Sequence, residues 1–247
     1  SICEPYIRRR AIRHLINEQA PEDGMVAYYA LHHADSKTQI FTYPAETDYA
    51  QGFITISRTG IDLFRPFLTM RLPIQDLDAS ADLLQRALPA GSEAFAAVPQ
   101  AYEPLIRAFC KIHSEEPLTL FKLDPRRYEP EVNVLVSRED QNGLPRFVIK
   151  QPINNRRSTV AAAGLNWQSP RFAEIAVHTR AEYRQRGFGR AVVRALAGHL
   201  LQHHRTPLYA VNPQNQPSVQ IAERLGFINT GHQELMFELQ MQGSPLT

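Results

Sequence analysis

Two glycines surrounded by arginines stand where a helix-forming stretch begins. Gly187 and Gly189 follow the β-forming run RFAEIAVH and a short polar turn. The first N–H groups of a helix lack partners inside the helix and form the positive end of its dipole, so they suit an anion such as a pyrophosphate. Glycine lets the backbone approach that anion closely. The predicted anion-binding turn consists of Arg184, Gln185, Arg186, Gly187, Phe188, Gly189 and Arg190.

Other glycine-rich motifs do not fit this turn. The dinucleotide-binding pattern needs a third small residue where Val192 stands. The phosphate loop of nucleoside triphosphatases needs Lys and then Ser or Thr where Arg190 and Ala191 stand. A glycine turn before an ordinary amphipathic helix explains this segment equally well when it is considered alone.

A second helix start lies further along the chain, after the β-forming run PLYAVNP. Asn215 is a good helix N-cap, and Pro217 falls in the first helical turn, where its missing N–H costs little. Gly226 suits a left-handed helix end, and Phe227 begins an apolar strand. These structural roles explain all four residues without a ligand.

Taken together, the two motifs resemble the signatures of the GNAT superfamily of N-acetyltransferases. Its first signature, Arg/Gln-x-x-Gly-x-Gly/Ala between a strand and a helix, is matched by Arg184, Gly187 and Gly189. Its second signature is matched by Asn215, Ser218, Gly226 and Phe227. The resemblance covers about residues 146–240. It implies a mixed, mostly antiparallel sheet flanked by helices, acetyl-CoA or another acyl-CoA as cosubstrate, and acyl transfer to the amine of a small molecule or a protein.

Attack of an amine on a thioester requires a base, because only the neutral amine is a nucleophile. The resemblance points to Glu174, in the strand before the anion-binding turn. Partial burial of that strand would raise the pKa of Glu174 toward neutrality, which suits a base. Strand alternation places His178 on the same face, as the reserve base. The alternative is that Glu174 is a surface carboxylate without a catalytic role.

The resemblance also implies contacts between the acyl-CoA and the strand residues Ile175, Ala176 and Val177, where the Val177 N–H meets the oxyanion. Asn215 and Ser218 are further expected cofactor contacts. Many GNAT members carry a tyrosine acid where Ala222 stands here. Tyr209 or an ordered water is a substitute proton donor. This departure keeps a non-catalytic acyl-CoA-binding or regulatory protein as the alternative function.

Composition and the remaining motifs narrow the function classes. The 247 residues carry a formal net charge of +2 and two cysteines, without a CxxC motif, an apolar membrane-spanning stretch or the apolar core of a signal peptide. A cytoplasmic protein without a membrane partner is expected. His199 and His203 have a metal-compatible spacing, but no third ligand is evident, so no metal site is predicted. The arginine-rich segment at residues 8–13 is expected to face solvent rather than nucleic acid.

Two α/β lobes are expected, because the segment at residues 124–145 is polar and turn-rich. The boundary is placed near Pro125, giving an N-terminal lobe over residues 1–125 and an acyl-CoA-binding GNAT domain over residues 126–247. Helices are expected at residues 4–17, 78–88, 102–112, 188–204 and 216–225. Strands are expected at residues 25–33, 38–44, 52–72, 93–99, 146–152, 158–168, 171–178, 207–213, 226–232 and 234–240.

The N-terminal lobe lacks both motifs, yet its mixed helix and strand order suits a degenerate copy of the same fold. Such a plan resembles glycine N-acyltransferase-like and tandem GNAT proteins. Ligand sites favour domain interfaces, so an acceptor pocket would be lined by Tyr28, Tyr29, Phe64 and Arg65. The alternative places these aromatic side chains in the core. The acceptor, the acyl chain length and the oligomeric state do not follow from the sequence.

Overall fold

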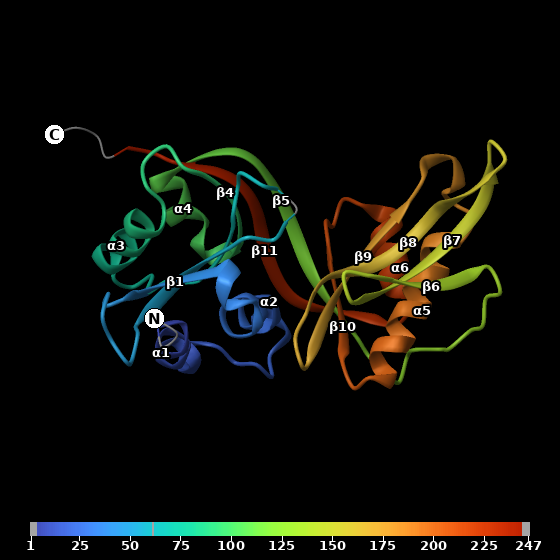
Figure 1. Ribbon diagram of the computed structural model, residues 1–247, viewed down its shortest axis with the longest axis horizontal. Coiled ribbons are helices and arrows are strands. Elements are labelled where there is room, and N and C mark those ends of the chain that lie inside the picture. The colour runs from blue at the N-terminus through green and yellow to red at the C-terminus, as the bar shows by residue number, and fades with distance from the viewer. Residues whose placement is uncertain (1–3, 61, 244–247) are drawn as a thin grey trace. The chain divides into compact units, whose positions relative to one another are not determined.

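The computed structural model describes residues 4–60 and 62–243 (Figure 1). Contacts divide the chain into two compact units. The first unit combines the residues up to Leu118 with those from His232 onward, and the second runs from Thr119 to Gly231. This division differs from the single boundary expected near Pro125, because the last strand leaves the second unit and pairs within the first.

The first unit is built on a mixed sheet. Its strands are β1 (Thr38–Tyr43), β2 (Gly52–Ser57), β3 (Phe67–Arg71), β4 (Glu93–Pro99) and the second part of β11 (Phe227–Met241). The first three strands are antiparallel neighbours. β3 then pairs parallel with β4, and the last parallel pair is Leu68 with Ala96. On its other side β4 takes β11, which runs antiparallel to it with Phe237 opposite Ala96.

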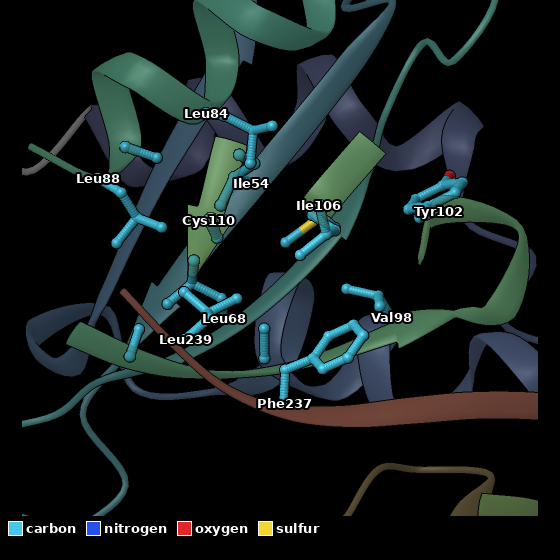
Figure 2. Close-up of a cluster of buried hydrophobic side chains, with 14 of the residues drawn as sticks. Ile54, Leu68, Leu84, Leu88, Val98, Tyr102, Ile106, Cys110, Phe237 and Leu239 are labelled. Atoms are coloured by element: carbon cyan, nitrogen blue, oxygen red, sulfur yellow. The ribbon is translucent and has the colours of Figure 1, made fainter. Parts of the chain in front are cut away.

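Helices cover both faces of this sheet, because successive strand side chains alternate between the faces. Phe53 packs with the first helix, α1 (Glu4–Ile12), and with α2 (Gly24–Ala27). Ile54 packs on the opposite face with α3 (Leu77–Ala87) and α4 (Glu103–Phe109). Figure 2 shows this second core, to which β11 contributes Phe237 and Leu239.

The run at residues 25–33 is helical rather than a strand. A 3₁₀ turn beginning at Pro21 leads into α2, which continues as a π-helical turn over Tyr28–His32. Most of these side chains are buried, and a short apolar run that is buried all round has no periodicity to distinguish helix from strand. The expected strand was therefore wrong.

The expected solvent-facing arginine helix is shorter than predicted and is tied to the protein itself. The helix α1 ends at Ile12 and is followed by a 3₁₀ turn. Arg8 donates to the carbonyl oxygen of Ile40 at 2.7 Å, and Arg9 donates to that of Ala30 at 3.1 Å. Arg8 and Arg9 therefore stabilise the first unit through hydrogen bonds to its backbone.

Like the first unit, the second has antiparallel strands followed by a helix, a parallel strand and a second helix. Its strands are β6 (Val136–Gln141), β7 (Leu144–Ile153), β8 (Arg156–Gln168), β9 (Phe172–Thr179), β10 (Thr206–Val211) and the end of β5 (Cys110–Leu123). β6 to β9 are antiparallel neighbours, β9 pairs parallel with β10, and β10 pairs antiparallel with β5. The helices α5 (Phe188–Gln202) and α6 (Gln216–Arg224) share one core with the sheet.

Two expected features of this half differ in the structure. The segment at residues 124–145 contains β6 and a tight turn through Asn142 and Gly143, both with positive φ, so part of it is strand. The two strands expected at residues 226–232 and 234–240 form one continuous strand, β11. Gly231 has a φ of 79° within it, at the residue where the chain passes into the first unit.

The parallel strands β9 and β10 stay paired over a short stretch only. Their register joins Phe172, Ala173 and Glu174 to Thr206, Pro207 and Leu208. Both strands continue for several residues beyond the last pair, β9 to Thr179 and β10 to Val211. In the described chain, the residues of β9 after Glu174 have no register partner on β10. The sheet therefore opens as a wedge from Glu174 toward α5.

Candidate active site

The turn between β9 and α5 has the backbone that its glycines predict. Gly187 is the N-cap of α5 and adopts a left-handed conformation with φ 77° and ψ 3°. Gln185, two residues earlier, also has a positive φ of 62°. Glycine adopts this conformation without strain. No side chain in the described structure caps this helix.

Six consecutive amides of this turn are unused. The first backbone hydrogen bond of α5 runs from the Ala191 N–H to the Gly187 carbonyl oxygen at 3.0 Å. None of the amides from Gln185 to Arg190 donates a hydrogen bond within residues 4–60 and 62–243. These N–H groups and the helix dipole together make a concentrated anion-binding feature.

Gly189 has a different reason for being glycine. A Cβ at this position would lie 3.0 Å from Oγ1 of Thr179 and 3.2 Å from Cδ1 of Ile221. The end of β9, the start of α5 and the middle of α6 therefore meet at Gly189. A larger residue would push these three elements apart.

The arginines around the turn carry positive charge without acidic partners. Arg184 donates through Nε to the carbonyl oxygen of Thr179 at 3.3 Å, which fixes the turn to the strand. The guanidinium of Arg186 lies over the ring of Tyr183, 5.0 Å from its centroid. The ion pairs found among the described residues include none formed by Arg184, Arg186 or Arg190. Their charge is therefore available to an anion at the turn.

The second motif has the structural roles that its residues predict. Asn215 accepts a hydrogen bond from the Ser218 N–H at 3.3 Å and caps α6. Gly226 has a φ of 91°, and a Cβ there would lie 2.8 Å from the carbonyl oxygen of Arg127. The contacts of Asn215 in the structure are therefore those of a capping residue.

Glu174 is buried at the vertex of the wedge. Its side chain is on the sheet face opposite α5 and α6, because its neighbours Ala173 and Ile175 belong to the core beneath those helices. The residue is only 9% exposed, and Asn166 Nδ2 donates to Glu174 Oε1 at 2.9 Å. The position is therefore not that of a surface carboxylate. His178 lies on the same strand but is exposed.

Asn166 is a site residue that sequence reasoning missed. It sits where the register between β8 and β9 shifts, so that Leu165 faces Ile175 and Trp167 faces Glu174. The extra residue of such a bulge re-aims neighbouring side chains. The only signal in the sequence was a polar Asn within the apolar run STVAAAGLNWQ.

Ala222, at the position of the family's tyrosine acid, and its expected substitute Tyr209 lie in the same core. Ala222 is fully buried in the core of the second unit and has no proton to give. Tyr209 lies on β10 in the same core. Burial raises the pKa of the Tyr209 phenol, and the Ser218 hydroxyl lowers it by less.

The residues expected to line an acceptor pocket do not form one group within the first unit. Tyr28 and Tyr29 lie on the π-helical turn, and Tyr29 is buried in contact with Phe67. Phe64 is 93% exposed, and Arg65 pairs with Asp62 at 2.8 Å. The alternative placement in the core therefore holds for Tyr29.

His199 and His203 have ring centroids 4.1 Å apart, but no described cluster of three or more His, Cys, Asp or Glu side chains is arranged to hold a metal ion. None of the described helices is long and apolar enough to cross a membrane.

Residues 155–236 match the family model described as FR47-like protein, and no curated protein matches the chain. A Drosophila protein of known structure is similar with a TM-score of 0.64 and 13% identity, over 95% of this chain and 88% of that one.

Two further structures are similar over nearly the whole chain. A GCN5-related N-acetyltransferase from Sphaerobacter thermophilus has a TM-score of 0.58 and 9% identity, over 98% of this chain and 95% of that one. A tandem GNAT protein from the clavulanic acid biosynthesis pathway has a TM-score of 0.56 and 12% identity, with the same coverage. The resemblance inferred from the two motifs is confirmed: the chain has the two-lobed GNAT fold, and residues 155–236 carry the FR47-like pattern.

Proposed function

We propose that this protein is an acyl-CoA-dependent N-acyltransferase that moves an acyl group, most simply acetyl, directly from coenzyme A to an amine. The cofactor site lies in the second unit. The observation that carries the proposal is the row of six unused amides from Gln185 to Arg190, flanked by unpaired arginines, at the N-terminus of α5. Such a row suits the pyrophosphate of coenzyme A.

The wedge between β9 and β10 gives the rest of the cofactor a path from this turn to Glu174. Ile175, Ala176 and Val177 pair with β8 on one edge of β9 but have no register partner on β10. Backbone groups on the β10 edge of this segment are therefore available to the pantetheine amides and to the oxyanion, for which we favour the Val177 N–H. Asn215 and Ser218, at the start of α6, remain proposed cofactor contacts.

Glu174 is the proposed base. It takes a proton from the ammonium form of the acceptor, and the neutral amine attacks the thioester carbonyl. The Asn166 amide holds one carboxylate oxygen, which orients the other for this transfer. His178 remains the reserve base, because it lies on the same face of β9 but in an exposed position.

Direct transfer is favoured over an acyl-cysteine intermediate. Cys110 is buried in the first unit, and burial raises the pKa of its thiol to about 11, so a reactive thiolate is not available there. Cys3 lies outside the described residues. After mixing with acetyl-CoA alone, intact-mass spectrometry should therefore show an unmodified chain.

A non-catalytic acyl-CoA sensor is the second candidate, favoured by the buried Ala222 at the position where many GNAT members carry a tyrosine acid. The two functions separate in a screen of small amines and peptide amines with detection of free thiol. An enzyme releases coenzyme A with one of them. A sensor binds acyl-CoA and releases no thiol above background.

The cofactor site itself is tested by a matched pair of substitutions. Gly187 and Gly143 both have a φ of 77°, so glutamate at either position meets the same backbone strain and adds the same charge. Gly187→Glu should abolish coenzyme A binding in calorimetry, whereas Gly143→Glu, in the β6–β7 turn, should bind like wild type. Equal affinity in both variants would remove the pyrophosphate assignment.

A further inference from the structure

A buried tyrosine with an unused hydroxyl lies at the vertex of the wedge. Tyr209 is the first residue of β10 beyond the last register pair, Leu208 with Glu174. Its side chain is 4% exposed, and its ring centroid is 5.9 Å from that of Phe227. The phenol oxygen has no hydrogen-bond partner among the residues that the structure describes.

This arrangement is unfavourable for the protein alone. Buried hydroxyls nearly always have a partner, and an unsatisfied one destabilises the folded state. Phenylalanine would fill the same space beside Phe227 without that penalty. A hydroxyl retained in this position points to a group that arrives from outside the chain.

The start of α6 connects this hydroxyl to the anion-binding turn. Ser218, in the first turn of α6, is close enough to Tyr209 to lower the pKa of its phenol, although the two hydroxyls do not reach hydrogen-bonding geometry. Ile221, one helical turn further on, lies beside Gly189. A ligand that begins at the α5 amides and enters the wedge therefore passes along α6 toward Tyr209.

We propose that Tyr209 gives the proton that the coenzyme A sulfur takes when the acyl group leaves, an inference that rests on the proposed function. Amine attack gives an intermediate with a positively charged nitrogen and a negatively charged oxygen. As the carbonyl re-forms, the C–S bond breaks and its electron pair stays on sulfur. The sulfur takes the Tyr209 proton, and the phenolate regains a proton from the product nitrogen through Ser218 or solvent.

The electrostatics suit this role. Because the balance of burial and Ser218 leaves the pKa of Tyr209 above its ordinary value of 10.0, the phenol stays protonated throughout the neutral range. A general acid must be protonated at the moment of transfer. Ala222, on α6, cannot supply that proton. Tyr209, on β10, therefore replaces the proton donor that α6 lacks.

Tyr209→Phe tests the inference, with Tyr102→Phe as the control in the first unit. The Tyr102 hydroxyl accepts a hydrogen bond from the Leu72 N–H at 3.1 Å, so its loss should lower the melting temperature and leave turnover intact. Tyr209→Phe should do the reverse. Its melting temperature should equal or exceed that of wild type, its calorimetric affinity for coenzyme A should persist, and its turnover should fall by about 10²-fold or more.

A second substitution keeps the hydroxyl and changes only its acidity. Site-specific replacement of Tyr209 by a fluorinated tyrosine lowers the phenol pKa, so turnover should decline as pH rises through that lower value, at pH values where wild type remains active. Wild-type turnover in Tyr209→Phe, or an unchanged pH profile with the fluorinated residue, would overturn the proton donor alone. A wild-type protein that binds coenzyme A but releases no thiol with any amine would overturn both this inference and the proposed enzyme.

Discussion

The two units repeat one plan but differ where their longer helices begin. Each has a run of antiparallel strands, three in the first unit and four in the second, followed by a helix, a parallel strand and a second helix on the same face of the sheet. The helix α3 begins at Asp76, whose carboxylate accepts a hydrogen bond from the Ala79 N–H, and Asp78 adds negative charge in its first turn. The helix α5 begins at Gly187 without a side-chain cap. A carboxylate therefore caps the helix in the first unit, whereas the amides at the corresponding helix start in the second unit have no side-chain cap.

The two units also differ at the residue where their parallel strands stop pairing, β3 with β4 in the first unit and β9 with β10 in the second. The last parallel pair contains Leu68 in the first unit and Glu174 in the second, on opposite faces of their sheets relative to the two helices that follow. Leu68 is fully buried in an apolar core, whereas Glu174 holds a carboxylate oxygen against Asn166. The first unit therefore ends its parallel pairing with an apolar side chain in its core, and the second ends it with a carboxylate on the other face of the sheet.

Each unit also buries a tyrosine in the core between its sheet and the two helices that follow. Tyr102 bridges the Leu72 N–H and carbonyl oxygen with its hydroxyl, while the described surroundings of Tyr209 offer its hydroxyl no hydrogen bond. The Tyr102 hydroxyl therefore satisfies two backbone groups of Leu72, whereas the Tyr209 hydroxyl satisfies no described backbone group. The two units therefore share an arrangement of strands and differ in the backbone and polar groups that they leave unsatisfied, and we propose that these groups bind the cofactor.

The largest expected effect concerns Glu174, which ends the parallel pairing in the second unit. Glu174→Gln keeps the shape and the acceptor for Asn166 but cannot take a proton, so turnover should fall by about 10²–10⁴-fold. Calorimetry should show unchanged coenzyme A binding. His178→Gln is the control on the same strand and should remain close to wild type; the opposite ranking of the two variants would make His178 the base.

The shared strand β11 allows a matched test of the two cores. Phe237 belongs to the core of the first unit and Phe227 to that of the second. Phe237→Ala should destabilise the first unit by about 3–5 kcal/mol because it leaves a cavity. Hydrogen exchange should then quicken in β4 and α3. Phe227→Ala should quicken exchange in α5 and α6 instead, and loss of protection in the same unit for both variants would contradict the division.

A single substitution can give α5 the kind of helix start that α3 has. Gly187→Asp gives α5 a carboxylate like that of Asp76, and Gly187→Asn gives it the neutral counterpart. Both residues tolerate a left-handed backbone. A like charge about 4 Å from a phosphate opposes binding by about 4 kcal/mol at an effective dielectric of 20, or roughly 10²–10³-fold in affinity. Equal calorimetric affinities for coenzyme A in the two variants would show that charge at this position is irrelevant.

The smallest expected effect concerns the buried tyrosines. Tyr102→Phe leaves the Leu72 N–H without its acceptor and should lower the free energy of unfolding by about 1–3 kcal/mol. Tyr209→Phe should not lower it. Chemical denaturation of both variants measures this difference directly, and equal destabilisation would mean that Tyr209 also has a structural partner.

Local signals in the sequence were enough for the strand-turn-helix segment at residues 171–202 and for α6. Glycine, asparagine and proline each have a backbone preference that acts within a few residues, so Gly187, Asn215 and Gly226 indicated both helix starts and one helix end. The roles of Glu174 and the cofactor contacts remain predictions.

Long-range effects could not be predicted in the same way. Residues 25–33 are mostly buried, so their sequence has no periodicity that distinguishes the observed helix from a strand. The bulge at Asn166 depends on the register with β9. The path of β11 into the first unit depends on its pairing with β4, more than 100 residues away in the sequence, and no local preference encodes such a partner.

That path also has a consequence for protein synthesis. At about 5–20 residues per second, a ribosome needs roughly 10 s to advance from Leu118 to the end of β11. Throughout that interval the nascent first unit lacks Phe237 and Leu239, and one edge of β4 is unpaired. Unpaired strand edges invite association with other chains. The unit made first is therefore the unit completed last, and chaperones that shield strand edges should matter most for its yield.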